Sequence, residues 1–212
     1  MRSDIIFHEV EQGSPEWFAL RLGRVTGTSA AELLVNGKGA DGIGAGAWSL
    51  IYQLAGEIVT GETPPDFSNY WTERGKEMEQ QAIEAYMEET FHQANRVGFI
   101  SWGKYAGCSP DLMVDEQRGG EVKCLSAREH FRYCHTRKIE KDYYAQIQWC
   151  LFVTGFEVWD YIHFHPNAGA WSLVIDEIRP DLEMHGIFAD RLGLLSTKVE
   201  WIVQLATNKI TI

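Results

Sequence analysis

The segment at residues 106–124 constrains this chain more than any other, because two short strands and a pair of carboxylates fit within it. Small residues at 106–110 precede Asp111 and a run of apolar positions, and a glycine-containing turn at 116–120 leads into Glu121. Strand, turn and strand is the simplest structure for such a pattern. Across two neighbouring strands of this kind, Asp111 lies beside Glu121. The sequence therefore predicts a hairpin that brings two carboxylates together.

Asp111 and Glu121 have the chemistry of ligands for a hard divalent cation. Mg²⁺ takes oxygen ligands from a few carboxylates, and it can activate water and neutralise the charge that builds on phosphorus during phosphodiester hydrolysis. Lys123 lies two positions after Glu121, so on a strand both side chains point to the same face. Its ammonium can orient the attacking water or stabilise the transition state. The alternative is an ordinary turn followed by a solvated Glu-Lys pair.

Three further blocks of sequence accompany this hairpin, and their order matters more than any one of them. They are residues 17–28 (WFALRLGRVTGT), 74–79 (RGKEME) and 143–148 (YYAQIQ). With Ser109-Pro110-Asp111 and Glu121-Val122-Lys123, these blocks resemble the PD-(D/E)XK nuclease signature, in the phage lambda exonuclease and YqaJ-type viral recombinase branch of that superfamily. The joint order of the blocks makes the resemblance specific. The chain after residue 155 matches no motif of the branch.

The resemblance implies a fold and an activity. The fold is α/β with a PD-(D/E)XK restriction-endonuclease-like core, a central mixed sheet flanked by helices. The activity is a Mg²⁺-dependent 5′-to-3′ exonuclease, with Mn²⁺ able to substitute, that acts on linear double-stranded DNA, releases 5′-mononucleotides and leaves a 3′ single-stranded overhang. The implied partners are two further copies in a homotrimer and a single-strand annealing protein of phage-type DNA recombination. The alternative is a non-catalytic DNA-end-binding or protein-interaction module on a nuclease-like fold.

The resemblance also assigns roles that spacing alone does not. The implied metal ligands are Asp111, Glu121 and the backbone carbonyl of Val122, while Lys123 activates water. Glu79 completes this cluster or a second metal site; without the resemblance it would be an ordinary glutamate on a helix. The positions that match the branch's 5′-phosphate contacts are Arg21, Thr28, Ser109 and Gln146, with threonine here where the lambda enzyme has serine.

The net charge of −11 conflicts with DNA binding, because affinity for DNA usually comes from lysine and arginine side chains that meet phosphates. Arg21 and Arg24 lie together near the start of the chain, and a second basic stretch occupies residues 128–141. A basic channel inside an acidic body would reconcile the two observations. The alternative is that residues 128–141 are the solvated face of a helix.

Length and composition predict a single nuclease domain at residues 1–212, since 45% hydrophobic residues suffice for a substantial core. No apolar run reaches the ~20 residues needed to span a bilayer, and no signal-peptide pattern opens the chain. We therefore expect a cytoplasmic protein of a bacterial host cell, without membrane contact. The 4 cysteines form no Cys-x-x-Cys pair, so reduced and mostly buried thiols are expected rather than a structural zinc site.

Periodicity and capping signals predict the remaining elements. Helices are expected at residues 14–22, 29–35, 48–60, 70–90, 126–139, 142–154 and 180–206. Strands are expected at residues 96–100, 157–165 and 171–177. The glycine-rich residues 36–46 formally satisfy Gly-x-Gly-x-x-Gly, but they lack the context of a dinucleotide site and indicate a mobile surface loop.

Two pairs of polar residues leave alternatives open. His163 and His165 share one face of a predicted strand, where they could chelate a transition metal, although such pairs are more often structural. Gln146 and Gln148 lie on different faces of a predicted helix, so only one of them is expected to face the site.

Overall fold

The computed structural model describes residues 2, 4–39, 41–62 and 70–208. Strands in these residues form two hydrogen-bonded sheets, an antiparallel one in the order β1-β2-β3 and a mixed one in the order β4-β5-β6-β7. The strands are β1 (Ile5–His8), β2 (Phe99–Trp102), β3 (Ala106–Cys108), β4 (Leu112–Met113), β5 (Arg118–Lys123), β6 (Val158–Phe164) and β7 (Leu173–Ile178). The expected mixed sheet is therefore confirmed, but it is continued by a second sheet.

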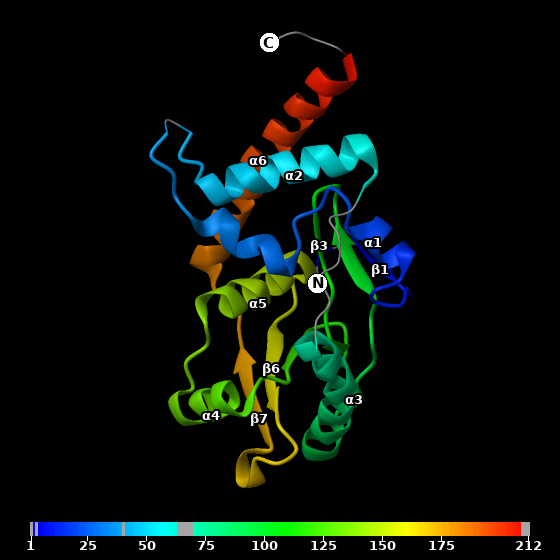
Figure 1. The fold of residues 1–212 in the computed structure, drawn as a ribbon, viewed down its shortest axis with the longest axis vertical. Coiled ribbons are helices and arrows are strands. Elements are labelled where there is room, and N and C mark those ends of the chain that lie inside the picture. The colour runs from blue at the N-terminus through cyan, green and yellow to red at the C-terminus, as the bar shows by residue number, and fades with distance from the viewer. Residues whose placement is uncertain (1, 3, 40, 63–69, 209–212) are drawn as a thin grey trace.

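The helices lie close to their expected positions. They are α1 (Pro15–Arg21), α2 (Ala45–Thr60), α3 (Tyr70–Thr90), α4 (Ala127–Thr136), α5 (Lys141–Thr154) and α6 (Leu182–Asn208), with two 3-10 helices, η1 (Gly27–Leu34) and η2 (Gly169–Trp171). Figure 1 shows α2 and α6 crossing at one end of the molecule, α3 and α4 at the other, and α5 between them. The described part of the chain contains no helix that is both long and apolar enough to cross a membrane.

The two sheets meet at Ser109-Pro110-Asp111, which joins β3 to β4. Proline has no backbone N–H to donate to a neighbouring strand, so a ladder of hydrogen bonds is readily interrupted at Pro110. Asp111 follows this break directly. The segment that the sequence marks as chemically active therefore lies at the joint between the two sheets.

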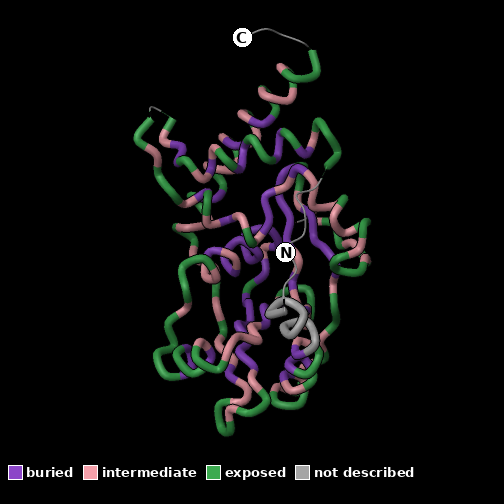
Figure 2. Tube along the Cα trace, viewed as in Figure 1, coloured by how far each residue is buried: buried purple, intermediate pink, exposed green. Residues whose placement is uncertain are grey.

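Strand β6 is the centre of the mixed sheet and is buried along its whole length. Its side chains alternate between two hydrophobic clusters, because successive residues of a strand point to opposite faces. Trp159 and Tyr161 pack in the cluster that includes α5, whereas Ile162 and Phe164 pack with Met78 of α3. Figure 2 shows this buried centre with exposed residues around it. Helix α3 thus covers one face of the mixed sheet and α5 the other.

Three local expectations need correction. The helix expected at 29–35 is the 3-10 helix η1, which begins two residues earlier, after Thr26. The strand expected at 96–100 begins only at Phe99. The glycine-rich segment is not irregular throughout, because Asn36 bridges Ile43 and Arg191 of α6 donates a hydrogen bond to the Gly42 carbonyl at 2.8 Å. These contacts anchor the segment to the body of the protein, and its mobility stays a prediction.

Three of the four cysteines are buried, as expected. Helix α1 also begins as its sequence indicates. Ser14 accepts a hydrogen bond from the Trp17 backbone N–H at 3.2 Å, and Pro15 occupies the first turn.

A buried polar network ties α3 to the mixed sheet. Asp160 of β6 is 1% exposed and accepts two hydrogen bonds from Arg118 of β5, at 2.7 and 3.0 Å. The Tyr86 hydroxyl of α3 donates to the same carboxylate at 2.5 Å, and burial together with Asp160 raises the pKa of Tyr86. Arg118 also pairs with Glu177 at the surface. The orientation of α3 on the sheet therefore depends on one carboxylate.

Replacing Asp160 by alanine should lower the free energy of unfolding by about 1.5–3 kcal/mol, because it removes the buried acceptor that Arg118 and the Tyr86 hydroxyl share and leaves them only Glu177 and His92. Urea unfolding followed by circular dichroism measures this. Glu177→Ala is the matched control, since it removes the exposed partner of the same arginine and should cost at most about 1 kcal/mol. A loss for Asp160→Ala no larger than that of the control would contradict the network's role.

Candidate active site

The pairing of β4 with β5 sets the first geometric feature of the site. Leu112 faces Gly120 in the antiparallel register, and the next step along the two strands brings Asp111 beside Glu121, as the hairpin prediction requires. The Val122 backbone N–H donates a hydrogen bond to Asp111 Oδ2 at 2.7 Å. The aspartate is thereby held against the strand that carries the glutamate.

Glu121 is 3% exposed, and its two carboxylate oxygens differ in their surroundings. Oε1 accepts hydrogen bonds from Lys123 Nζ at 2.6 Å and from Gln146 Nε2 at 2.7 Å. Oε2 is buried and has no hydrogen-bond partner in the part of the chain that the structure describes. A buried carboxylate oxygen without a partner is costly, and a bound cation is one way to satisfy it.

Lys123 is positioned by its contacts with Glu121 and with Tyr143. Its side chain is mostly buried, and its ammonium lies 4.5 Å from the ring centroid of Tyr143, on α5. Burial alone would lower the pKa of Lys123, but the negative charges of Glu121 and Asp111 outweigh burial and raise it. Lys123 therefore carries its proton at neutral pH, which suits a group that orients water or stabilises charge rather than one that takes up a proton.

The pKa of Asp111 is raised well above its ordinary value, first by burial and then by the charges of Glu121 and Glu79. Glu79 is thus electrostatically coupled to the site from α3, although it also forms an ion pair with Arg96 at 3.0 Å. Asp111 and Glu79 line a cavity of about 870 Å³ together with residues 7–12 and 95–98. The side chains of residues 74–77, from the same sequence block as Glu79, lie outside the described part.

These features fit a divalent cation. Asp111 and Glu121 are poorly solvated, Glu121 Oε2 lacks a partner among the described residues, and burial followed by the charges of Glu121 and Glu79 raises the pKa of Asp111. A dication would relieve all three conditions. The described residues nevertheless hold no group of three His, Cys, Asp or Glu side chains already arranged around one point. Since Lys123 and Gln146 both occupy Glu121 Oε1, binding a cation there would require local rearrangement.

The four residues matched to 5′-phosphate contacts lie around this centre. Gln146 contacts Glu121 directly. Ser109 precedes Asp111 by two positions and accepts a hydrogen bond from the Trp17 indole at 2.9 Å. The Arg21 guanidinium lies over the ring of the same tryptophan, 4.2 Å from its centroid. Arg21 also donates a hydrogen bond to the Thr26 hydroxyl at 3.4 Å, and the hydroxyl of Thr28 lies 3.2 Å from the hydroxyl of Thr26.

Arg21 has the character of an anion-binding residue. Burial lowers its pKa, and the nearby charge of Glu57 opposes that effect, but a guanidinium stays protonated in proteins. Within the described residues Arg21 makes no ion pair with a carboxylate, and its one hydrogen bond goes to Thr26. A largely buried cation with most of its donors unused favours an anionic ligand.

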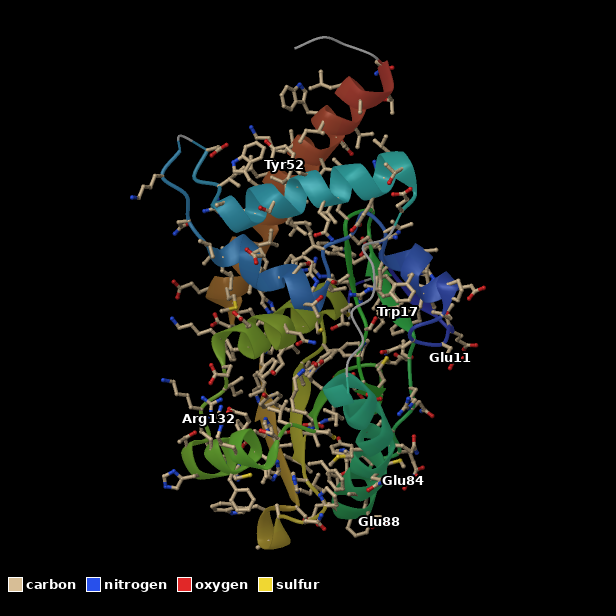
Figure 3. All side chains as sticks on the ribbon, viewed as in Figure 1. Glu11, Trp17, Tyr52, Glu84, Glu88 and Arg132 are labelled. Carbon is tan, nitrogen blue, oxygen red and sulfur yellow. The ribbon has the colours of Figure 1, made fainter. Side chains whose placement is uncertain are left out.

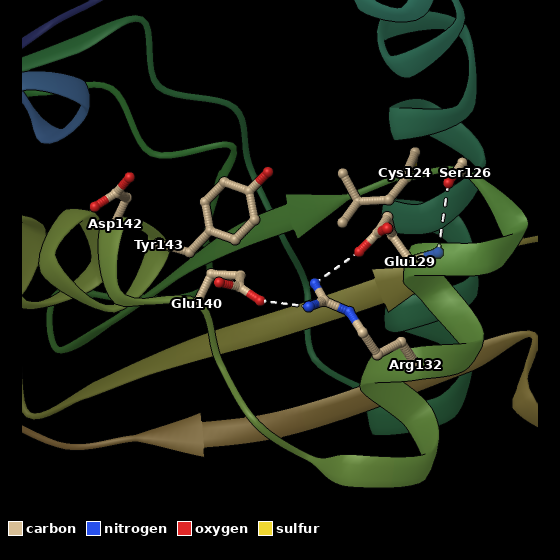
Figure 4. Close-up of a pocket in the computed structure, with 8 residues that line it drawn as sticks. Cys124, Ser126, Glu129, Arg132, Glu140, Asp142 and Tyr143 are labelled. Carbon is tan, nitrogen blue, oxygen red and sulfur yellow. Dashed lines mark hydrogen bonds and ion pairs between the residues drawn. The ribbon is translucent and has the colours of Figure 1, made fainter.

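The arginines of the basic stretch at 128–141 do not form a free basic surface. Its arginines have acidic partners: Arg128 and Arg132 pair with Glu129, Arg132 also pairs with Glu140, and Arg137 pairs with Asp176. Figure 4 shows the Arg132 guanidinium between its two carboxylates, in a cavity of about 620 Å³ that Tyr143 also lines. The solvated, self-neutralised helix face is therefore the interpretation that the structure supports.

The two open alternatives are also resolved. Gln146 faces the site, whereas the side chain of Gln148 is buried against α6 and donates to the Arg179 carbonyl at 2.9 Å. His163 is buried and stacks on Tyr133 with ring centroids 3.8 Å apart, and burial lowers its pKa to about 3. The ring of His163 therefore packs as a core side chain of β6.

Two functional contacts were not foreseen from the sequence. Tyr143 lies three residues before Gln146, so one face of α5 contacts both Glu121 and Lys123. The three-residue spacing of Tyr143 and Gln146 on a helix was a signal from which the Tyr143 contact could have been predicted. Trp17 contacts Ser109, 92 positions away, and no local pattern marks such a pair.

Asp111→Asn should stabilise the protein at high pH when divalent cations are removed with EDTA. A carboxyl whose folded-state pKa is raised destabilises the fold as pH rises from the unfolded pKa of about 4 through the folded value. The asparagine keeps the acceptor for Val122 but not the charge. Melting temperatures between pH 5 and pH 9 measure the difference, which should grow with pH. Asp115→Asn, on the exposed turn, is the control; a variant that is less stable than wild type at pH 9 would contradict the electrostatic account.

Comparison with known proteins identifies a family and several solved structures that resemble this chain. Residues 16–157 match the model of the YqaJ-like viral recombinase domain. Solved structures of LHK-Exo, an alkaline exonuclease from Laribacter hongkongensis, one of them in complex with dAMP, are 25% identical, with a TM-score of 0.76, and cover 93% of this chain and 100% of theirs. The comparison with curated proteins found no match.

A phage related exonuclease from Haemophilus somnus 129PT shares the fold, with 14% identity, a TM-score of 0.66, and coverage of 87% of this chain and 96% of its own. The expected nuclease-type α/β fold is thus confirmed. The family match covers more than half of the chain and includes Asp111, Glu121 and Lys123. The chain therefore belongs to the YqaJ-like viral recombinase domain family.

Proposed function

We propose that this protein is a Mg²⁺-dependent exonuclease that degrades linear double-stranded DNA in the 5′-to-3′ direction, releases 5′-mononucleotides and leaves a 3′ overhang. The observation that carries the proposal is one mostly buried cluster, in which Lys123 contacts Glu121 and Asp111 is hydrogen-bonded to Val122 between them. The similarity to LHK-Exo, which is described as an alkaline exonuclease, supports the reaction class. The structure of that protein with dAMP supports a mononucleotide product.

In this proposal the cation is held by Asp111, Glu121 and the Val122 carbonyl, with Glu79 near enough to contribute to the same or a second ion. When bound, Mg²⁺, or Mn²⁺ in its place, lowers the pKa of a water and neutralises charge on the phosphate. The protonated Lys123 donates hydrogen bonds to the attacking water or to a phosphate oxygen. Gln146 fixes the Glu121 carboxylate through its amide.

The proposed polarity follows from the position of Gln146. Its amide contacts the carboxylate at the reaction centre and belongs to the set matched to 5′-phosphate contacts. A terminal phosphate that bound to Gln146 and Ser109 would place the first phosphodiester of the strand beside Asp111. Cleavage there would release one nucleotide at a time from the 5′ end.

The assembly and the partner are also part of the proposal and rest on family membership. A homotrimer that encloses DNA would let the active site stay on one strand for many cycles despite the net charge of −11. A single-strand annealing protein would receive the 3′ overhang, in phage-type recombination within the bacterial cytoplasm. A non-catalytic module would have no need of Asp111, Glu121 and Lys123 together.

Asp111→Ala and Glu121→Ala should each reduce nucleotide release by more than roughly a hundredfold, because each removes a ligand of the cation rather than core volume. Lys123→Ala should lose catalysis while still binding Mg²⁺ and DNA. The assay is the Mg²⁺-dependent release of acid-soluble nucleotide from linear duplex DNA. Asp115→Ala is the control and should keep the wild-type rate. Near-normal turnover by either folded ligand variant would refute the metal assignment.

A 5′-phosphorylated duplex should be digested faster than its 5′-hydroxyl counterpart, by about tenfold to a hundredfold, because a guanidinium gains charged hydrogen bonds only with the phosphate. Arg21→Ala should remove most of that preference. Initial rates on the two substrates at fixed low salt measure it. Arg128→Ala, which removes an exposed arginine of α4, should leave the preference intact. Equal rates on both substrates for the wild type would refute the phosphate pocket.

A further inference from the structure

Trp17 lies between two groups that the proposed function assigns to the 5′-phosphate. Its indole Nε1–H donates to Ser109 Oγ at 2.9 Å, and the face of its ring carries the Arg21 guanidinium at 4.2 Å. Figure 3 shows Trp17 on α1, beside the strands of the antiparallel sheet. One side chain thus contacts a residue of its own helix and a residue at the joint between the two sheets.

The indole is held in place independently of these two contacts. Its N–H is shared with the Gly98 carbonyl at 3.0 Å, and Phe18 packs edge-on against the ring at 5.0 Å. Gln12 reinforces the same region, because its amide donates to the Val97 and Pro110 carbonyls at 3.0 and 2.9 Å. The ring is therefore held by the Gly98 carbonyl and by Phe18, next to a backbone segment that Gln12 fixes.

The direction of the hydrogen bond to Ser109 has a chemical consequence. An indole N–H can only donate, so the serine oxygen must accept. The hydroxyl hydrogen of Ser109 is then left to point elsewhere and can donate to an anion. If Ser109 instead donated its hydroxyl hydrogen to a protein carbonyl, it would present only oxygen lone pairs to a phosphate.

The contact with Arg21 has a parallel consequence. A cation held over an aromatic face is attracted by the ring and uses none of its N–H groups. The guanidinium keeps its planar set of donors for a bidentate contact with phosphate. Within the described residues Arg21 makes one hydrogen bond, to Thr26, and that bond is long at 3.4 Å.

We propose that Trp17 is a positioning residue for 5′-phosphate selectivity: the indole orients Ser109 as a donor and holds Arg21 with its donors free. This inference deepens the proposed function and depends on it. Trp17 acts through its two neighbours and does not itself contact the reacting atoms.

Trp17→Phe tests the inference, since phenylalanine keeps an aromatic face for Arg21 but removes the N–H. The quantity measured is the ratio of kcat/KM on a 5′-phosphorylated duplex to that on a 5′-hydroxyl duplex. We expect the ratio to fall about fivefold, the effect of one neutral hydrogen bond. Trp17→Leu removes the aromatic face as well and should lower the ratio further. A tryptophan with a merely structural role would slow digestion of both substrates equally and leave the ratio unchanged.

Trp102 supplies a matched control in the same chain. Its indole also donates to an oxygen, Asp4 Oδ2, at 2.8 Å, and also carries an arginine, Arg2, over its ring at 3.8 Å. Trp102→Phe therefore deletes the same kind of contact away from the phosphate residues and should not alter the ratio.

A double-mutant cycle separates a path through Ser109 from a general loss of packing. If the indole acts through that hydroxyl, Ser109→Ala with Trp17→Phe should give the same ratio as Ser109→Ala alone. A wild-type preference that Trp17→Phe leaves intact, or two losses that simply multiply, would overturn the inference while the phosphate pocket stands. Equal wild-type rates on the two substrates would instead overturn the pocket and the inference together.

Discussion

The pairing of β4 with β5 is the constraint on which the rest of the structure depends. That register brings Asp111 beside Glu121, and burial with mutual repulsion raises the pKa of the aspartate. Two like charges in a poorly solvated place are unfavourable, so the surroundings must compensate. Lys123, Gln146 and the Val122 N–H supply that compensation within the hairpin and α5. Under the proposed function, a chain that keeps such a cluster gives up stability for a site that a dication would complete.

The site lies where the two sheets join, and elements from both sides hold it. Pro110 interrupts the backbone ladder next to Asp111, which leaves that segment to be fixed by side chains. Gln12 and Trp17 fix it from the N-terminal part of the chain, while α3 contributes Glu79, which lines one cavity with Gln12 and Asp111. The Asp160 carboxylate ties α3 to β5 and β6 through Tyr86 and Arg118. Positioning at this joint is therefore distributed over contacts that are far apart along the chain.

The sequence predicts what is local and misses what is distant. The hairpin around Asp111 and Glu121, the Ser14 cap and the strands β6 and β7 follow from turn signals and periodicity within a few residues. The Arg191 anchor of the glycine-rich segment joins positions 149 residues apart, and the ion pair of Arg137 with Asp176 joins positions 39 apart. Neither separation leaves a trace in local periodicity. The resemblance supplied the roles of Glu79 and Arg21, which spacing could not.

The central claim is that Asp111 and Glu121 bind a divalent cation, and diffraction from a crystal soaked in Mn²⁺ tests it most directly. The account predicts an anomalous peak within about 2.0–2.3 Å of oxygens from both carboxylates, with water completing the shell. It also predicts that Glu121 Oε2, which has no partner in the present structure, becomes a ligand. Full Mn²⁺ loading of the crystal with no peak between these residues, and with Lys123 and Gln146 still the sole partners of Glu121, would contradict it.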